Sequence, residues 1–288
     1  MQDSLFQTEA GFQPLAARMR PATLDDYVGQ KHLVGPGKPL RRAVEQGQLH
    51  SMILWGPPGV GKTTFARLLA NVGELSYETL SAVLSGVKEI REVVERARTR
   101  KQSQGRESLL FVDEVHRFNK SQQDAFLPHI ENGTFIFVGA TTENPSFELN
   151  SALLSRTRVY VLKNLERDDI LQLLHRAITS DAGFGGRLLI DKDVLDTLAE
   201  SAGGDARRAL NILEVAADLA DPEGPEASRI TAATLEQVLQ TSLRRFDKGG
   251  DVFYDQISAL HKSVRGSNPD GSLYWLCRML DGGCDPLY

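Results

Sequence analysis

Residues 53–64, with the sequence ILWGPPGVGKTT, constrain the fold of this chain more than any other stretch. An apolar run ends in a loop rich in glycine and proline, and an amphipathic segment follows from Phe65 to Ala70. This is the strand, loop and helix order of a phosphate-binding loop. Glycines let the backbone approach a phosphate closely, and the backbone N–H groups and the helix N-terminus attract negative charge. We therefore predict that this segment binds a nucleoside triphosphate.

The full G-x-x-x-x-G-K-T pattern lies between strand and helix signals, which favours phosphate binding over a glycine-rich turn without a ligand. Lys62 is expected to reach the β- and γ-phosphates, and the hydroxyl of Thr63 is expected to hold Mg²⁺. The residues predicted to contact the nucleotide here are Gly56, Pro57, Pro58, Gly59, Val60, Gly61, Lys62, Thr63 and Thr64.

A second motif follows another buried strand. Residues 109–112 are apolar without alternation, as in a central strand of a parallel sheet, and Asp113 and Glu114 come directly after them. Ligands of such sheets bind at the carboxyl ends of the strands. Asp113 is predicted to hold the magnesium ion, and Glu114 to polarise the attacking water. A small-molecule kinase has no use for this glutamate, and residues 119–122 lack the aspartate of a guanine-reading motif, so we predict ATP hydrolysis.

Two further polar positions are candidates for sensing the γ-phosphate. A buried strand is predicted over residues 134–138, and the polar segment after it contains Thr142, our predicted sensor, and Asn144, the alternative. A short helix then ends in two arginines. Arg156 is favoured over Arg158 as an arginine that enters a neighbouring subunit's site, where its planar, permanently charged group would stabilise the transition state.

The pattern changes near residue 165 and divides the chain. Residues 18–164 are predicted to form an α/β core, a P-loop NTPase with a parallel sheet flanked by helices. Residues 165–245 have a purely helical pattern, which predicts an all-α lid domain. In this lid, Asp205 caps a helix whose first turn presents two arginines, and Arg207 is predicted to report the nucleotide state by moving the lid.

The two ends of the chain differ from the rest. Residues 1–17 lack a long apolar period and are predicted to be a flexible arm. Within the arm, Gln2–Phe6 resembles the peptides that bacterial proteins insert into the sliding clamp, and a terminus without a partner is the alternative. Residues 250–288 contain two strongly apolar helical segments, which predict either the start of a third domain that is cut short or a contact between subunits.

Composition narrows the class of protein. A length of 288 residues is enough for two domains with cores of their own. The net charge of −5 argues against a protein that coats nucleic acid by bulk charge, although a local basic surface is compatible with it. No run approaches the ~20 apolar residues of a membrane-spanning helix, so we predict no membrane contact. The two cysteines fit neither a disulfide framework nor a zinc site, and a reducing cytoplasm is expected.

The chain resembles the bacterial replication-associated recombination protein A family in residues 14–21, 51–59, 113–131, 139–156 and 262–267. The resemblance implies an AAA+ ATPase of the clamp-loader group that uses ATP and Mg²⁺. It also implies action on single-stranded, gapped or forked DNA at stalled or damaged replication forks, in the bacterial cytoplasm at the nucleoid. Single-strand-binding protein is the implied partner, and a homotetramer built through a C-terminal helical domain is the implied assembly.

Carried over position by position, the resemblance assigns Walker A to Gly56–Thr63 and Walker B to Asp113 and Glu114. It assigns sensor 1 to Thr142, the arginine finger to Arg156, and the sensor 2 arginine to Arg207.

In AAA+ ATPases, a segment like the one around Val28 and Gly29 packs on the adenine ring. Because family members run past residue 288, we expect this chain to be truncated. Two other functions share the same motifs: an ATP-gated scaffold in which hydrolysis only resets recruitment, and a clamp-loader or Holliday-junction motor subunit.

Overall fold

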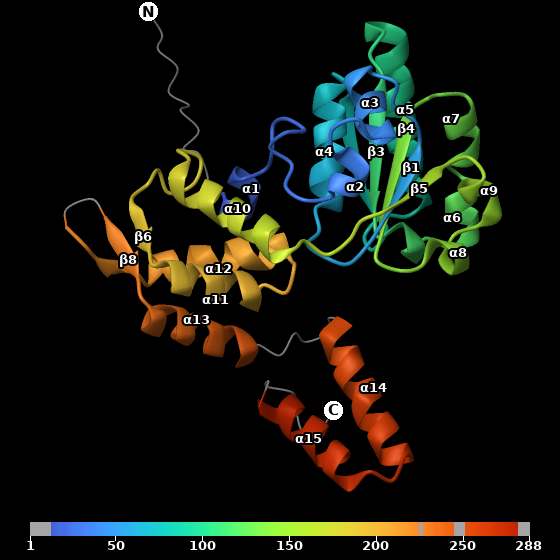
Figure 1. The fold of residues 1–288 in the computed structure, drawn as a ribbon. Coiled ribbons are helices and arrows are strands. Elements are labelled where there is room, and N and C mark those ends of the chain that lie inside the picture. Colours follow the sequence, from blue (N-terminus) through green and yellow to red (C-terminus); the bar gives the residue numbers. More distant parts are fainter. Residues whose placement is uncertain (1–12, 225–226, 245–250, 282–288) are drawn as a thin grey trace, which may run out of the picture. The chain divides into compact units, whose positions relative to one another are not determined.

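The computed structural model describes residues 13–224, 227–244 and 251–281 (Figure 1). The chain divides into two compact units: residues 1–187 with 195–213, and residues 188–194 with 214–288. The first unit carries all the predicted nucleotide-binding residues. The sequence predicted a single boundary between the core and the lid, at residue 164/165. In the structure, residues 165–187 and 195–213 of the predicted lid belong to the same compact unit as the core.

The first unit is built on a five-stranded parallel sheet with the strand order β2-β3-β4-β1-β5. β4 lies between β1, which leads into the phosphate loop, and β3, which ends in the two acids. The carboxyl ends of these three strands therefore meet at one edge. The strands are β1 (Met52–Trp55), β2 (Ser76–Ser81), β3 (Ser108–Asp113), β4 (Ile136–Thr141) and β5 (Arg158–Val161).

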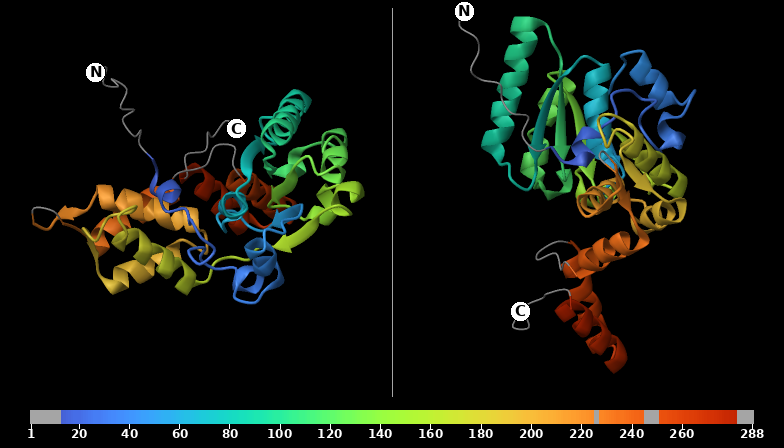
Figure 2. Two further views of the ribbon diagram at one scale, coloured as in Figure 1. Left: turned by 90° about the horizontal axis from the view of Figure 1, so that it is seen from above. Right: turned by 90° about the vertical axis from the view of Figure 1, so that its left-hand side faces the viewer.

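Helices cover both faces of this sheet, which confirms the predicted AAA+ fold class. Met52 and Leu54 of β1 belong to the core cluster that includes the apolar residues of α4 (Lys62–Val72), whereas Ile53 belongs to the cluster that includes those of α5 (Val87–Gln104). Figure 2, on the right, shows these two helices on opposite faces. Because both faces are buried, residues 109–112 are apolar without alternation.

The other helices of this unit are short, apart from those of the lid. They are α1 (Leu15–Arg18), α2 (Lys31–Val34), α3 (Pro39–Glu45), η1 (Val115–Arg117), α6 (Lys120–Asp124), α7 (Leu127–Glu131), α8 (Pro145–Glu148) and α9 (Ser151–Leu154). The lid helices are α10 (Arg167–Thr179), α11 (Lys192–Ser201) and α12 (Ala206–Asp218), and each of the last two has residues in both units.

Two sequence predictions in this unit were wrong in detail. The strand expected over residues 134–138 runs from Ile136 to Thr141, because its last residues pair with β1 up to Trp55. Residues 13–17 do not belong to a flexible arm, since Leu15 begins α1 and is fully buried. A four-residue helix is too short to show a period in the sequence. The clamp-type segment Gln2–Phe6 lies outside the described residues.

The second unit contains a small sheet that the helical pattern did not predict. β6 (Leu188–Ile190) pairs in parallel with β8 (Ser228–Ile230), which pairs antiparallel with β7 (Asp221–Pro222). Because it contains this sheet, the lid is not all-α as predicted. The sequence did not indicate the sheet, since strands of two or three residues give no periodic signal. The helices α13 (Ala232–Arg244), α14 (Asp251–Arg265) and α15 (Pro269–Asp281) complete the unit. None of the described helices combines the length and the apolar composition that a membrane crossing requires.

Candidate nucleotide site

Lys62 begins α4, and its side chain is buried beneath the phosphate loop. The Nζ atom donates hydrogen bonds to the carbonyl oxygens of Gly56 (2.6 Å) and Pro57 (2.9 Å). Burial lowers the pKa of Lys62, and the charges of Glu114 and Asp113 oppose that effect. The two acids therefore lie close enough to the lysine to act on its charge, at the same edge of the sheet.

Tyr27 supports the phosphate loop, although no sequence pattern singles it out. Gly61 precedes α4 with φ +99°, and a Cβ atom there would lie 2.8 Å from the Tyr27 hydroxyl. That hydroxyl donates to the carbonyl of Gly61 (3.3 Å), and the Tyr27 ring packs against Phe65 with 5.3 Å between centroids. Burial raises the pKa of Tyr27 well above its ordinary value, so the hydroxyl stays protonated and keeps donating.

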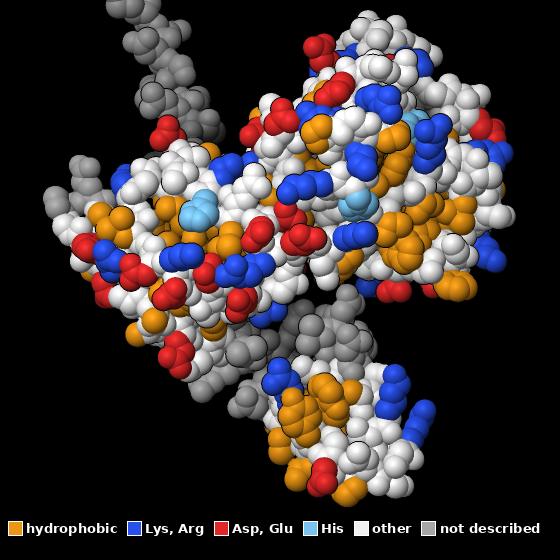
Figure 3. Space-filling view, in the orientation of Figure 1, with side chains coloured by type: hydrophobic (Ala, Val, Ile, Leu, Met, Phe, Trp, Pro, Cys, Tyr) orange, Lys and Arg blue, Asp and Glu red, His pale blue; other side chains and the backbone are white. Residues whose placement is uncertain are grey.

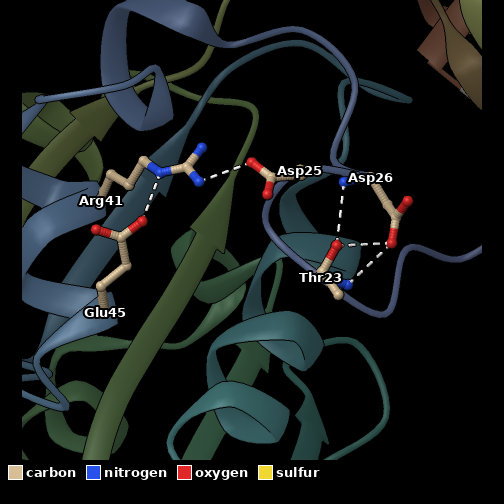
Figure 4. Close-up of polar contacts among 5 residues, drawn as sticks. All are labelled: Thr23, Asp25, Asp26, Arg41 and Glu45. Carbon is tan, nitrogen blue, oxygen red and sulfur yellow. Dashed lines mark hydrogen bonds and ion pairs between the residues drawn. The ribbon is translucent and has the colours of Figure 1, made fainter.

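A turn held by side chains leads into the predicted adenine segment (Figure 4). The hydroxyl of Thr23 donates to Asp26 (2.7 Å), and the Asp26 N–H donates back to that hydroxyl (3.3 Å). Arg41, from α3, binds both Asp25 and Glu45 at 2.7 Å. The ion pair between Arg41 and Asp25 therefore ties the turn to α3.

Gly29, which together with Val28 is predicted to pack on adenine, lies against the start of the lid. Gly29 has φ +76°, and a Cβ atom on it would lie 2.3 Å from the Cδ2 atom of Leu165. Gln30 exchanges two hydrogen bonds with the backbone of Lys163, at 2.7 and 3.0 Å. Only glycine tolerates both this φ and this close approach.

The N-terminus of α12 lies directly on the phosphate loop. The N–H of Ala206 donates to the carbonyl of Gly59 (3.1 Å), and Asp205 accepts the N–H of Arg208 (2.9 Å), as predicted for the cap. Burial has the largest effect on the pKa of Lys62 and lowers it, and Glu114 and Asp113 raise it. The charge of Arg207, the next largest effect, lowers it again. Arg207 therefore acts electrostatically on Lys62, and its role in reporting the nucleotide state stays a prediction.

Replacing Gly59 by alanine should weaken ATP binding, whereas Gly47→Ala should not. The two glycines have nearly equal φ angles, +69° and +67°, so each substitution costs about 1–2 kcal/mol of backbone strain. Only at Gly59 would the new Cβ atom meet a neighbour, 1.8 Å from Asp205 Oδ1, while Gly47 has nothing within 4 Å. We expect calorimetric titration to show a loss of about tenfold, or ~1.4 kcal/mol, for Gly59→Ala alone. Equal affinities in the two variants would contradict this role of the lid contact.

The predicted sensor and the predicted water-polarising acid are in contact. Glu114 follows β3 with φ +52°, a conformation uncommon for residues other than glycine. The hydroxyl of Thr142 donates to Oε2 of Glu114 at 3.5 Å. The side chain of Asn144, in contrast, caps α8 by accepting the N–H of Ser146 (3.0 Å). Of the two candidates, only Thr142 is thus recorded in contact with Glu114, and its role as the sensor stays a prediction.

The residues predicted to hold Mg²⁺ fit that ion in their chemistry. Thr63 and Asp113 offer a hydroxyl and a carboxylate, the hard oxygen ligands that Mg²⁺ prefers. Asp113 raises the pKa of Lys62, which directly precedes Thr63, so the two ligands lie in one neighbourhood. The described residues contain no cluster of three or more His, Cys, Asp or Glu side chains suited to a metal. An ion bound here would share its coordination with phosphate oxygens and water.

Arg156 and Arg158 do not join the site of their own chain. Arg156 forms an ion pair with Glu131 of α7 and donates to the carbonyl of Ala152 (2.9 Å). Arg158 begins β5 and is exposed. Within the described residues, neither arginine makes a hydrogen bond or ion pair with the phosphate loop. A role of Arg156 in a neighbouring subunit's site stays a prediction.

Two more arginines, for which the sequence predicted no role at the site, share its electrostatic environment. Burial lowers the pKa of Arg20, and the charges of Arg67 and Arg207 lower it further. The guanidinium of Arg67, from α4, lies 4.6 Å above the ring of Tyr77. Cationic groups from the N-terminal segment, the core and the lid thus act on one another. Such a concentration of positive charge favours the binding of a polyanion such as a triphosphate.

Comparison with known proteins shows which protein families this chain is similar to. Residues 52–165 match the model of the ATPase family associated with various cellular activities (AAA), and residues 185–265 match that of the AAA C-terminal domain. The chain is 57% identical over 287 residues to replication-associated recombination protein A of Escherichia coli strain K12, an alignment that covers 99% of this chain and 64% of that protein.

The protein of the same name from Coxiella burnetii is 58% identical over 279 residues, covering 96% of this chain and 62% of that protein. The chain thus spans slightly less than two thirds of the length of these relatives. Among solved structures, the RuvB Holliday junction branch migration motor of Thermotoga maritima is similar with a TM-score of 0.63 at 25% identity. That likeness covers 86% of this chain and 80% of the RuvB chain.

Proposed function

This chain belongs to the replication-associated recombination protein A family of AAA ATPases, and from that membership we propose that it hydrolyses ATP with Mg²⁺. The observation that carries the proposal is the meeting of Lys62, Glu114 and Thr142 at the carboxyl ends of three adjoining strands. Adenine would lie against Val28 and Gly29, and the triphosphate would lie along residues 56–64.

In the proposed reaction, a water oxygen attacks the γ-phosphorus, and the bond from that phosphorus to the β–γ bridging oxygen breaks. Glu114 accepts the proton of the water, and Thr142 and Lys62 orient and neutralise the γ-phosphate oxygens. A Mg²⁺ ion held by Thr63 and Asp113 would offset the charge that develops on the phosphates. Arg207 from the lid, and Arg156 from a neighbouring subunit, would add positive charge as the transition state forms.

We propose that hydrolysis is coupled to DNA at stalled or damaged replication forks, where it remodels the DNA or the proteins bound to it. The names of the relatives, which refer to replication and recombination, support this step. The proposed substrates are single-stranded, gapped or forked DNA, and single-strand-binding protein is the proposed partner. Gln2–Phe6 would bind the sliding clamp. The proposed place of action is the bacterial cytoplasm, at nucleoid-associated forks.

A homotetramer is the proposed assembly, and the second unit supports it. Figure 3 shows hydrophobic side chains gathered over α15. Leu273 is 61% exposed and Tyr274 57%, and Leu276 and Leu280 on the same helix are also exposed. An apolar face of this kind on a folded helix is typical of a surface that binds another protein subunit.

The decisive test of the DNA step compares ATPase rates with and without single-stranded and gapped DNA. We expect both DNAs to raise the rate severalfold, because an ATPase whose hydrolysis is coupled to DNA should hydrolyse ATP slowly in the absence of DNA. The same assay on a full-length relative is the control. Absence of stimulation in both proteins would contradict the proposal, and stimulation of the relative alone would assign the coupling to the part of its length that this chain does not span.

A second candidate is a motor that moves DNA junctions, and the likeness to the RuvB structure favours it. Such a motor and a fork-remodelling ATPase share the nucleotide chemistry described above and differ in the DNA they act on. Movement of a labelled four-way junction by this chain, in the presence of ATP, would favour the junction motor.

A further inference from the structure

We propose that His116 is a positioning residue that holds the carboxylate of Glu114 and ties it to the end of β4, an inference that rests on the proposed ATP hydrolysis. His116 lies in η1, two residues after Glu114, and its side chain is only 13% exposed. Its Nδ1 atom lies 2.9 Å from the hydroxyl of Thr141 and 3.3 Å from Oε2 of Glu114. One ring nitrogen therefore joins the ends of two neighbouring strands.

The partners of Nδ1 decide which atom carries the hydrogen. A carboxylate only accepts, so the contact with Glu114 is attractive only when Nδ1 is protonated. The hydroxyl of Thr141 lies 3.3 Å from the carbonyl oxygen of Glu143, to which it can donate, and its oxygen accepts the Glu143 N–H (3.0 Å). In the proposed tautomer, Nδ1 carries the hydrogen, donates it to the Thr141 hydroxyl, and lies 3.3 Å from Oε2 of Glu114. A partner at one ring nitrogen fixes the tautomer in this way.

The contacts with Glu114 use only one of its two oxygens. His116 and Thr142 both approach Oε2, while in the described part of the chain Oε1 has no hydrogen-bond or ion-pair partner. This arrangement holds Oε2 in place and leaves Oε1 to accept a proton from water. A general base must be held in this way, because an error of about 1 Å in position can cost on the order of 100-fold in rate.

The backbone of Glu114 explains why this residue needs a support, and the position of Thr141 shows what the support is attached to. Its left-handed φ of +52° is a strained conformation that costs on the order of 1–3 kcal/mol and persists only where neighbours enforce it. Thr141, the other partner of His116, is fully buried, and its carbonyl accepts the N–H of Gly56 at 3.2 Å. His116 thus connects the catalytic acid to a strand end that also touches the first glycine of the phosphate loop.

An ordinary buried histidine would contribute to folding alone, and matched variants separate the two roles. Asparagine places its amide nitrogen near the position of Nδ1, whereas glutamine reaches toward Nε2. We expect His116→Ala and His116→Gln to lower kcat about tenfold or more, and His116→Asn to stay within about threefold of the unaltered chain. ATP affinity and KM should change little in all three, and Tm should not fall in step with kcat. Equal losses in the Asn and Ala variants, or a loss confined to KM or Tm, would overturn the proposal.

A second measurement does not depend on turnover. In ¹⁵N-histidine-labelled protein, NMR detects which ring nitrogen of His116 is protonated, and His116→Asn identifies its signals by their loss. We expect a protonated Nδ1 whose shift changes in Thr141→Val and in Glu114→Gln. An unprotonated Nδ1, or shifts indifferent to both variants, would overturn the proposal. A chain without ATPase activity but with the expected NMR result would instead refute the proposed function and leave the contact standing.

Discussion

Replacing Glu114 by glutamine should lower kcat for ATP hydrolysis by about 10²–10⁴-fold while ATP binding persists. The amide has nearly the same shape, and its oxygen can still accept the hydrogen bond from Thr142. It cannot take a proton from water, so the attack on the γ-phosphorus loses its general base. Lys62, Thr63 and Asp113, which are proposed to hold the triphosphate and its metal ion, are unchanged.

Single-turnover hydrolysis and calorimetric ATP titration measure the two halves of this expectation. Glu148→Gln is the matched control, because Glu148 is an exposed acid on α8, the helix after the sensor segment. It should retain kcat within about twofold, as surface substitutions usually do. A Glu114→Gln variant that hydrolyses ATP at the rate of this control would remove Glu114 from the mechanism.

The same variant separates the proposed remodelling activity from an ATP-gated scaffold. A scaffold that needs only bound ATP should recruit its partners at least as well when hydrolysis is blocked. A remodelling ATPase should bind DNA and ATP yet lose every DNA-dependent effect that requires turnover. Recruitment assays and fork-remodelling assays on one preparation of Glu114→Gln therefore give opposite results for the two functions.

The strands and helices around the predicted nucleotide motifs could be predicted from the sequence because their signals are local. The loop from Gly56 to Thr63 needs its glycines and lysine at fixed spacing between a strand and a helix, and the structure has β1 and α4 there. The acids at 113–114 could be placed beside the loop because parallel strands present their carboxyl ends at one edge. Thr142 followed from the same rule, although its strand was placed about three residues too early.

Other parts of the site depend on contacts between residues far apart in the chain. Tyr27 meets Gly61 across 34 residues, and His116 meets Thr141 across 25. The approach of Asp205 to Gly59 requires the lid to fold back on the core. Spacing rules describe single helices, strands and loops, so they cannot show these pairs. The three-stranded sheet of the second unit was missed for a different reason, since its strands are too short to show alternation.

Lys62→Met should remove most of the stabilisation that ATP gives, yet leave the nucleotide-free chain almost as stable as before. In that chain, two effects of Lys62 oppose each other. Burial of the ammonium is unfavourable, as its lowered pKa indicates, whereas its hydrogen bonds to Gly56 and Pro57 are favourable. Methionine removes both effects and fills a similar volume, so we expect the free energy of unfolding without ATP to change by no more than about 1 kcal/mol.

With ATP the two chains should differ clearly. At an ATP concentration 100 times Kd, the unaltered chain gains about 2.7 kcal/mol, and a 100-fold loss of affinity in Lys62→Met would leave only about 0.4 kcal/mol. Denaturant unfolding with and without ATP measures both values. Lys101→Met is the control, because Lys101 also donates to a backbone carbonyl, that of Gly133 (2.6 Å), but from an exposed position on α5. If Lys62→Met destabilised the nucleotide-free chain by several kcal/mol, the lysine would be a structural residue first. If it kept the full effect of ATP, the phosphates would have to bind elsewhere.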